Sequence, residues 1–308
     1  MTEQVRSIQA DMSERAAAYV AQQATRSLLY EVSVTPKPGL VDRLDSGAHS
    51  DMDFFTYLDS SVALTEYFRS AYLEGSTRSA LTPPELFACL RKLGLQAERQ
   101  MYAATSGVNT HKGSVFTLGL FCGGLGWLNG REEQPDVPSL LRLCGQMVTP
   151  AFAAELDGIN VRSAKSGGER FYAATGFAGI RGEAAAGYPS LSRCGLPALR
   201  RALEQGYSIN DAGVIVLLEL LCHVHDSNLF ARCGAEKQQE LARAARDILD
   251  AEHLDLNRVI QMNRQCVRDW ASPGGCADLL AATFFLHFYF LSRTAQGSIL
   301  AIRHVLTK

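Results

Sequence analysis

The chain has 308 residues, of which 47% are apolar, and its formal net charge at pH 7 is −2. That length and apolar content are sufficient for a full hydrophobic core. A charge so close to neutral gives no general attraction to nucleic acid or to an anionic membrane. We therefore expect a soluble globular protein that binds neither, and any anion site must come from local clusters of basic residues.

The cysteines and the apolar runs indicate a cytoplasmic location. None of the eight cysteines belongs to a C-x-x-C pair and most lie in apolar runs, which is typical of free thiols in a reducing compartment and disfavours a zinc site. The N-terminus has no apolar signal region. The longest apolar runs, residues 114–128 and 279–291, are shorter than the roughly 18 to 20 residues that span a bilayer. They are predicted to be buried helices.

Helical patterns follow one another along the whole chain. Apolar residues recur every three or four positions over residues 2–29, which predicts the first helix. A second helix is predicted from a cap at Asp51 or Asp53 to Gly75, and a third after the capping box at residues 82–85. Further helices are predicted near residues 113–128, 138–154, 196–205, 209–224, 235–251, 253–268, 276–291 and 293–306. Sustained alternation of period two is absent, so we expect an all-α, bundle-like single domain spanning residues 1–308.

The segment from Thr35 to Asp53 interrupts this helical pattern with prolines, glycines and charged side chains. Prolines restrict the backbone and glycines permit tight turns, so charged groups can converge at little entropic cost. The charged residues are Lys37, Asp42, Arg43, His49, Asp51 and Asp53. This composition predicts a binding site for a charged ligand; the alternative is a rigid surface loop with solvated charges.

Two further glycine-flanked segments carry basic residues. In Gly107–Gly113, residues Asn109, His111 and Lys112 immediately precede an apolar helix, whose free amides would suit a phosphate. The alternative is an ordinary helix cap with an exposed lysine. In residues 179–184, Arg181 offers a planar fork for phosphate and Glu183 a contact to a metal or hydroxyl group.

Three more segments complete the polar pattern. Residues 223–228 follow an apolar helix and contain two histidines without further ligands at metal-binding spacing, so Asp226 is the candidate there. In residues 272–278, a Pro-Gly-Gly turn exposes amides of Gly274 and Gly275, and Asp278 would need a cation beside an anion. As an alternative, Asp278 is an ordinary first-turn acid. The Gly-rich stretch 163–189, which includes Lys165, is predicted to be an ordered functional loop.

Basic and acidic residues occur together in these segments, which favours a metal–polyphosphate site over a simple phosphate or metal site. Carboxylates would hold Mg²⁺, the metal would bridge phosphate oxygens, and Lys and Arg would neutralise the remaining charge. Neither G-x-x-x-x-G-K-[ST] nor a strand-borne G-x-G-x-x-G is present. A nucleoside triphosphate is the expected kind of substrate.

In this order, the segments resemble the triphosphoribosyl-dephospho-CoA synthase family, which makes the prosthetic-group precursor of the citrate lyase and malonate decarboxylase acyl carrier proteins. The matching stretches are TPKPGLVDRLDSGAHSDMD (35–53), GVNTHKG (107–113), GIRGEA (179–184), DSNLFARCG (226–234) and SPGGCADLLA (272–281). Asp45 and Cys233 depart from the family pattern, which commonly has asparagine and glycine there; Asp45 would add negative charge near the proposed metal.

The resemblance implies transfer of the 5-triphosphoribosyl group of ATP to the ribose 2′-hydroxyl of 3′-dephospho-CoA, with release of adenine. A carboxylate would stabilise positive charge at the ribose C1 while a base accepts the hydroxyl proton. The phosphate-binding candidates are Lys37, Arg43, Asn109, Lys112, Arg181, Gly274 and Gly275; the metal or C1-facing carboxylates are Asp51, Asp53, Asp226 and Asp278; the base is Glu183 or Asp42; and the proton donors to adenine are His49 and His111.

Asp53 is also predicted to be catalytic, so Asp53→Asn is expected to reduce turnover at least a hundredfold. Two other function classes stay open at this point: an Mg²⁺-dependent ADP-ribosyl-type glycohydrolase, and a non-catalytic nucleotide-binding accessory protein. The sequence does not distinguish the citrate lyase system from the malonate decarboxylase system. The apolar helices 213–222 and 279–291 would serve either the core or a homodimer interface.

Overall fold

The computed structural model describes residues 3–157 and 167–306, and over these residues every regular element is a helix and no strand occurs. The predicted all-α fold is confirmed. The assignment of residues 1–308 to one domain stays a prediction. The elements are α1 (Glu3–Ser33), α2 (Phe54–Ala63), α3 (Thr65–Thr77), α4 (Pro83–Ala104), α5 (Lys112–Gly130), α6 (Val137–Leu156), α7 (Gly167–Thr175), α8 (Gly179–Ala185), the π-helical turn η1 (Leu191–Gly195), α9 (Leu196–Glu204), α10 (Ile209–His223), α11 (Ser227–Leu249), α12 (Leu256–Arg268) and α13 (Gly274–Leu306).

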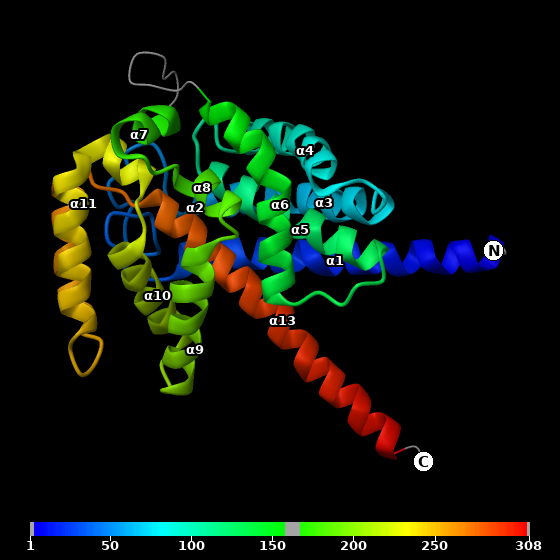
Figure 1. Cartoon of the computed structure of the whole chain (residues 1–308). Helices are drawn as coiled ribbons and strands as arrows, with labels where there is room; N and C mark the ends of the chain where they lie inside the picture. The colour runs from blue at the N-terminus through cyan, green and yellow to red at the C-terminus, as the bar shows by residue number, and fades with distance from the viewer. Residues whose placement is uncertain (1–2, 158–166, 307–308) are drawn as a thin grey trace.

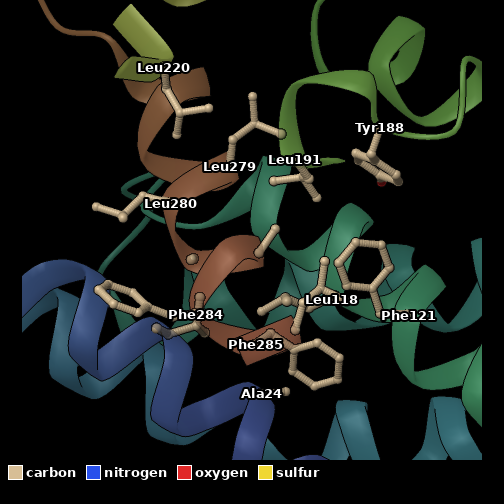
Figure 2. Packing of buried hydrophobic residues seen from close by; sticks show 14 of the residues in the cluster. Ala24, Leu118, Phe121, Tyr188, Leu191, Leu220, Leu279, Leu280, Phe284 and Phe285 are labelled. Atoms are coloured by element: carbon tan, nitrogen blue, oxygen red, sulfur yellow. The ribbon is translucent and has the colours of Figure 1, made fainter. Parts of the chain in front are cut away.

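Apolar side chains from most of these helices form one continuous buried cluster. α1 and α13 are the long helices of the molecule and contact each other, with α3 and α5 packed alongside (Figure 1). Phe284 and Phe285 of α13 lie between α1 and α5, where Phe284 approaches Tyr30 of α1 and Phe285 approaches Phe121 of α5 (Figure 2). Burying these rings stabilises the fold by roughly 1.5–3 kcal/mol per side chain. The start of α13 is thereby anchored in the core.

Close contact between α3 and α5 explains the glycines of the apolar run at residues 114–128. A Cβ atom added at Gly75 of α3 would lie 2.0 Å from the carbonyl oxygen of Gly123, and one added at Gly126 would lie 2.0 Å from that of Tyr72. No side chain fits in either place, so the two backbones touch. This packing fixes the position of α5, whose first turn contributes to the functional site.

Helix boundaries differ from the predictions at three points. The second predicted helix is interrupted at Leu64 and forms α2 and α3. The helix predicted over 235–251 starts at Ser227, with a kink at Gly234, where φ is +77°. The two helices predicted at the C-terminus are a single α13. Part of the predicted loop 163–189 is helical in α7 and α8, and Lys165 lies outside the described residues.

Within residues 3–157 and 167–306, no single helix combines the length and apolarity that a membrane span requires. α10 and α11 meet those criteria only as a pair, and that pair is bent by 62°.

Candidate active site

A cavity of about 480 Å³ lies where several of the predicted segments meet. It is bordered by the loop after α1 and by the N-terminal ends of α5, α8, α11 and α13. The predicted site residues that line it are His49, Asp51, Asn109, His111, Lys112, Arg181, Glu183, Asp226, Gly274, Gly275 and Asp278. Residues far apart in the sequence are thus brought to one place by the ends of helices.

Lys37, Asp42 and Arg43 do not line this cavity. Lys37 is 1% exposed and forms a buried ion pair with Glu31. Asp42 is 2% exposed and stabilises the loop from inside, because its oxygens accept hydrogen bonds from the backbone N–H groups of Lys37 (2.8 Å) and Leu44 (2.7 Å). Arg43 points away, toward Asn210. All three charged side chains thus contact protein groups outside the cavity lining, which differs from the expected ligand contacts.

Asp53 also lies outside the cavity lining. Its exposed side chain caps α2, with Oδ1 accepting hydrogen bonds from the backbone N–H (2.9 Å) and the hydroxyl (2.8 Å) of Thr56. The bonds from Thr56 lower the pKa of this carboxyl group. Asp53 therefore has a structural explanation as a helix cap, whereas the sequence predicted a metal-binding and catalytic residue.

Asp278 projects from the first turn of α13 toward the first turn of α5. Its Oδ1 accepts a hydrogen bond of 2.6 Å from the Ser114 hydroxyl. A Cβ atom added at Gly113 would lie 1.9 Å from Oδ2, so the glycine makes room for the carboxyl group. Burial raises the pKa of Asp278 to about 7, against the lowering effect of the bond from Ser114. This carboxyl group can accept or release a proton near neutral pH.

Asp226 is almost fully buried at the start of α11. Its Oδ1 accepts hydrogen bonds from the backbone N–H groups of Asn228 (2.8 Å) and Leu229 (3.0 Å), and its Oδ2 accepts one from that of Cys276 (2.9 Å). The chain at Gly275 passes close to the same carboxylate. Asp226 thus joins the N-terminal ends of α11 and α13, and most of its lone pairs are used in doing so.

His49 is held between two side chains at the cavity wall. Its Nε2 lies 2.8 Å from the Ser272 hydroxyl, and its Nδ1 lies 3.3 Å from Nη2 of Arg232. Because a guanidinium group only donates, Nδ1 is the acceptor and Nε2 carries the hydrogen. Burial, followed by the charge of Arg232, lowers the pKa of His49 to about 4. His49 is therefore neutral at pH 7 with both nitrogens occupied.

His111 is 2% exposed and has one nitrogen without a partner. Its Nδ1 lies 2.8 Å from the Ser60 hydroxyl, which itself accepts a hydrogen bond of 2.7 Å from Thr110. The Ser60 hydrogen is therefore donated to Nδ1, and the ring hydrogen sits on Nε2. Over the described part of the chain, Nε2 is buried with no hydrogen-bond partner. Burial and the charge of Lys37 lower the pKa of His111 to about 3, so the ring presents a neutral N–H donor.

The cationic side chains Lys112 and Arg181 are about half exposed. Nζ of Lys112 lies 3.0 Å from Glu98, and Nη1 of Arg181 lies 2.7 Å from Glu155. Exposed ion pairs of this kind contribute only about 0–1 kcal/mol to stability, so an anionic ligand can replace the acidic partners. Both residues remain suitable for binding phosphate.

The remaining carboxylates, those of Glu183 and Asp51, differ in their exposure and in the contacts of their oxygens. Both oxygens of Glu183 accept hydrogen bonds from Ser190, and burial raises the pKa of Glu183. Asp51 is largely exposed, with its carboxylate 3.9 Å from Nδ1 of His49. Among the described residues, no cluster of three or more His, Cys, Asp or Glu side chains is arranged to hold a metal. Mg²⁺ commonly needs only one or two carboxylates when substrate phosphates supply other ligands, and Asp51 fits that requirement.

The cavity residues that the sequence analysis did not predict include Glu31, Ser114 and Arg232. Glu31 continues the apolar stripe of the first helix, three positions after Leu28, and an acidic residue at a core position would have been a usable signal. Arg232 lies within the matching stretch 226–234 and donates a hydrogen bond of 2.9 Å to the carbonyl of Ala48. For Ser114, no sequence signal separates this serine from others at helix starts.

Comparison with known proteins gives a consistent family. Residues 17–296 match the family described as ATP:dephospho-CoA triphosphoribosyl transferase. A protein of Streptococcus pyogenes serotype M18, named probable 2-(5″-triphosphoribosyl)-3′-dephosphocoenzyme-A synthase, is 37% identical over 283 residues, covering 87% of this chain and 96% of the relative. A protein of the same name from serotype M3 is 38% identical with the same coverage. No solved structure matches the chain.

Proposed function

The chain belongs to the ATP:dephospho-CoA triphosphoribosyl transferase family, and from this premise we propose that the cavity is the active site of a triphosphoribosyl-dephospho-CoA synthase. The family predicted from the motifs is confirmed, and with it the assignment as a pentosyltransferase. The observation that supports the site is that His111 and Lys112 of one segment, Arg181 of a second and Asp278 of a third line one cavity.

The reaction exchanges one bond at C1 of the ATP ribose for another. The bond from C1 to N9 of adenine breaks, and a bond forms from C1 to the 2′-oxygen of dephospho-CoA. The acceptor hydroxyl loses a proton, adenine gains one, and the triphosphate stays on the transferred ribose. The protein must therefore supply a base, a hydrogen-bond donor for adenine and a site for the triphosphate.

Asp278 is the base in this proposal. A base works best when its pKa lies near the working pH, and burial brings the pKa of Asp278 to about 7. The bond from Ser114 fixes the orientation of the carboxyl group, leaving Oδ2 for the acceptor hydroxyl. Of the bases predicted from the sequence, Asp42 lies outside the cavity lining and Glu183 is bonded through both oxygens to Ser190.

His111 is the donor to the leaving adenine. Its neutral Nε2–H donates a hydrogen bond to a ring nitrogen of adenine, stabilising the negative charge that develops as the C1–N9 bond breaks. His49 is less suitable because both of its nitrogens are already bonded.

Lys112 and Arg181 bind phosphate groups in this proposal. Asp51 would hold Mg²⁺ together with the triphosphate, and the metal would then supply charge neutralisation and orientation of the phosphates. A cytoplasmic location and a homodimer remain predictions.

Release of adenine from ATP tests the function. The purified protein with ATP and Mg²⁺ is expected to release adenine only when dephospho-CoA is present, with one triphosphoribosyl-dephospho-CoA formed per adenine. Adenine or ribosyl hydrolysis without the acceptor would indicate a glycohydrolase. Binding of ATP with no product under either condition would indicate an accessory protein.

A further inference from the structure

A smaller recess of about 150 Å³ lies beside the cavity and is bordered by α4, α5 and α6. It shares Glu98, Lys112, Phe116 and Arg181 with the cavity, so the two spaces meet at these residues. The remainder of its wall is largely apolar, with Phe87, Leu90, Leu95, Ala151 and Phe152 among its residues. The proposed chemistry at C1 does not use this recess.

We infer that the recess receives the pantetheine arm of dephospho-CoA, an inference that rests on the proposed function. The pantetheine arm is an uncharged chain of methylene, methyl and amide groups that ends in a thiol. An apolar recess suits such a chain, whereas the polar cavity suits the ribose and phosphate groups. The pyrophosphate of dephospho-CoA, where the arm joins the nucleotide, would lie at the junction between the two spaces.

The charges at that junction fit a pyrophosphate. Arg91, Lys112 and Arg181 stand against Glu98 and Glu155, so basic side chains outnumber acidic ones there. Glu155 is shared between Arg91 (3.0 Å) and Arg181 (2.7 Å), and each basic partner is about half exposed. A ligand anion can readily replace the acidic partner in such pairs, because exposed ion pairs contribute little to stability in water. An entering pyrophosphate can therefore bind Lys112 and Arg181 without uncovering a buried charge.

The size of the cavity also supports placing the pantetheine arm in the recess and the ribose and phosphate groups in the cavity. Pockets of about 300–1,000 Å³ enclose most of one drug-sized ligand, and the cavity has about 480 Å³. ATP and dephospho-CoA together are considerably larger than one such ligand. Part of the pair must lie outside the cavity, and the recess is the apolar space that adjoins it.

Gly94 of α4 allows the recess to be filled by mutation. A Cβ atom added there would meet only the Tyr67 hydroxyl, at 3.5 Å, which is ordinary contact. Gly94→Leu is expected to raise KM for dephospho-CoA at least tenfold and leave KM for ATP within twofold, while Gly94→Ala, the matched smaller substitution, raises KM for dephospho-CoA by less than Gly94→Leu. Unchanged KM for dephospho-CoA in Gly94→Leu, or an equal rise in both KM values, would overturn the inference.

Chemical trapping gives a second readout that does not depend on turnover. Leu95→Cys places a thiol at the recess, and Val62→Cys places one on exposed α2 as the reference. The probe is the mixed disulfide of dephospho-CoA with thionitrobenzoate. The introduced thiolate attacks the pantetheine sulfur, a protein–pantetheine disulfide forms, and thionitrobenzoate leaves as the thiolate.

Peptide mapping then locates the label among the cysteines. We expect Leu95→Cys to react at least tenfold faster than Val62→Cys and to be protected by S-methylated dephospho-CoA. Equal rates, or no protection, would exclude the recess as the pantetheine site. If the wild-type protein forms no triphosphoribosyl product, the proposed function fails whatever the trapping result, so the two failures can be told apart.

Discussion

The Ser114 hydroxyl and Oδ1 of Asp278 lie 2.6 Å apart, although 164 positions separate them in the sequence. This hydrogen bond joins the first turns of α5 and α13. The carboxyl group of Asp278 has a pKa of about 7, because burial raises it. This contact therefore fixes the position of the proposed base, whereas burial, against the lowering effect of the bond, sets its protonation behaviour.

Replacing Asp278 by asparagine keeps the shape of the side chain but removes the base. We expect Asp278→Asn to lower kcat by about 10²–10⁴-fold, the usual contribution of general base catalysis. In the wild-type protein, kcat/KM for dephospho-CoA should rise with pH along a limb centred near pH 7, as Asp278 ionises. Adenine release measured from pH 5.5 to 9 checks both statements. A profile without that limb would remove Asp278 from the role of base.

The same pKa makes the stability of the protein depend on pH. Because the native carboxyl group keeps a proton that the unfolded chain releases, its contribution to stability is complete below about pH 4, decreases as the pH rises to about 7, and is constant above. Asp278→Asn should lack this decrease, so the variant should gain stability relative to wild type between pH 5 and pH 8. Urea denaturation at these pH values measures the difference. Parallel changes in both proteins would contradict the raised pKa.

His111 offers a third prediction, because its Nε2–H is buried without a partner among the described residues. His111→Phe retains a ring that can pack against Tyr57 but has no donor, and we expect kcat to decrease by about 10²-fold with little change in KM for ATP. His111→Gln, which keeps an N–H donor, should retain more activity than His111→Phe. Because the pKa of His111 is about 3, neither variant should remove a limb of the pH profile above pH 5. Equal activity of the two variants would argue against a role as donor.

The sequence patterns predicted the helical class and most helix positions because both depend on local periodicity and capping. The break at Leu64 was not predictable, since the apolar pattern continues across it. Convergence of His111, Lys112, Arg181 and Asp278 at one site was expected from the shared composition of their segments and from the family resemblance, and these residues do line one cavity. Periodicity and spacing in the sequence carry no distances between segments.

Two predicted site residues show why the composition of a segment does not indicate where a charged side chain points. Lys37 lies in a segment rich in charged side chains and was predicted to bind phosphate, but it is buried against Glu31, which belongs to the apolar face of α1. Asp53 was predicted to bind metal, but Thr56 three positions later satisfies it as a helix cap. Side-chain direction depends on such partners, and a partner on another helix is invisible in a local pattern.

The position of Asp53 changes the result expected from its mutation. Asp53→Asn should keep near-normal turnover, in contrast to the hundredfold loss expected from the sequence, because asparagine still caps α2 and the side chain does not line the cavity. Asp53→Ala removes the cap and should cost about 1 kcal/mol of stability. Kinetics and thermal denaturation of the two variants check this. A large loss of turnover in a stably folded Asp53→Asn would restore Asp53 to the site.

The buried pair of Lys37 and Glu31 distinguishes a structural lysine from a phosphate ligand. Lys37→Met leaves Glu31 buried without its partner, which should destabilise the protein by about 3–5 kcal/mol. The double variant Lys37→Met/Glu31→Gln removes both charges and should recover most of that loss. Urea denaturation of the wild type, both single variants and the double variant gives the coupling energy. Lys37→Met should leave KM for ATP unchanged where it remains folded, because Lys37 does not line the cavity. A raised KM for ATP with no loss of stability would instead identify Lys37 as a ligand of the triphosphate.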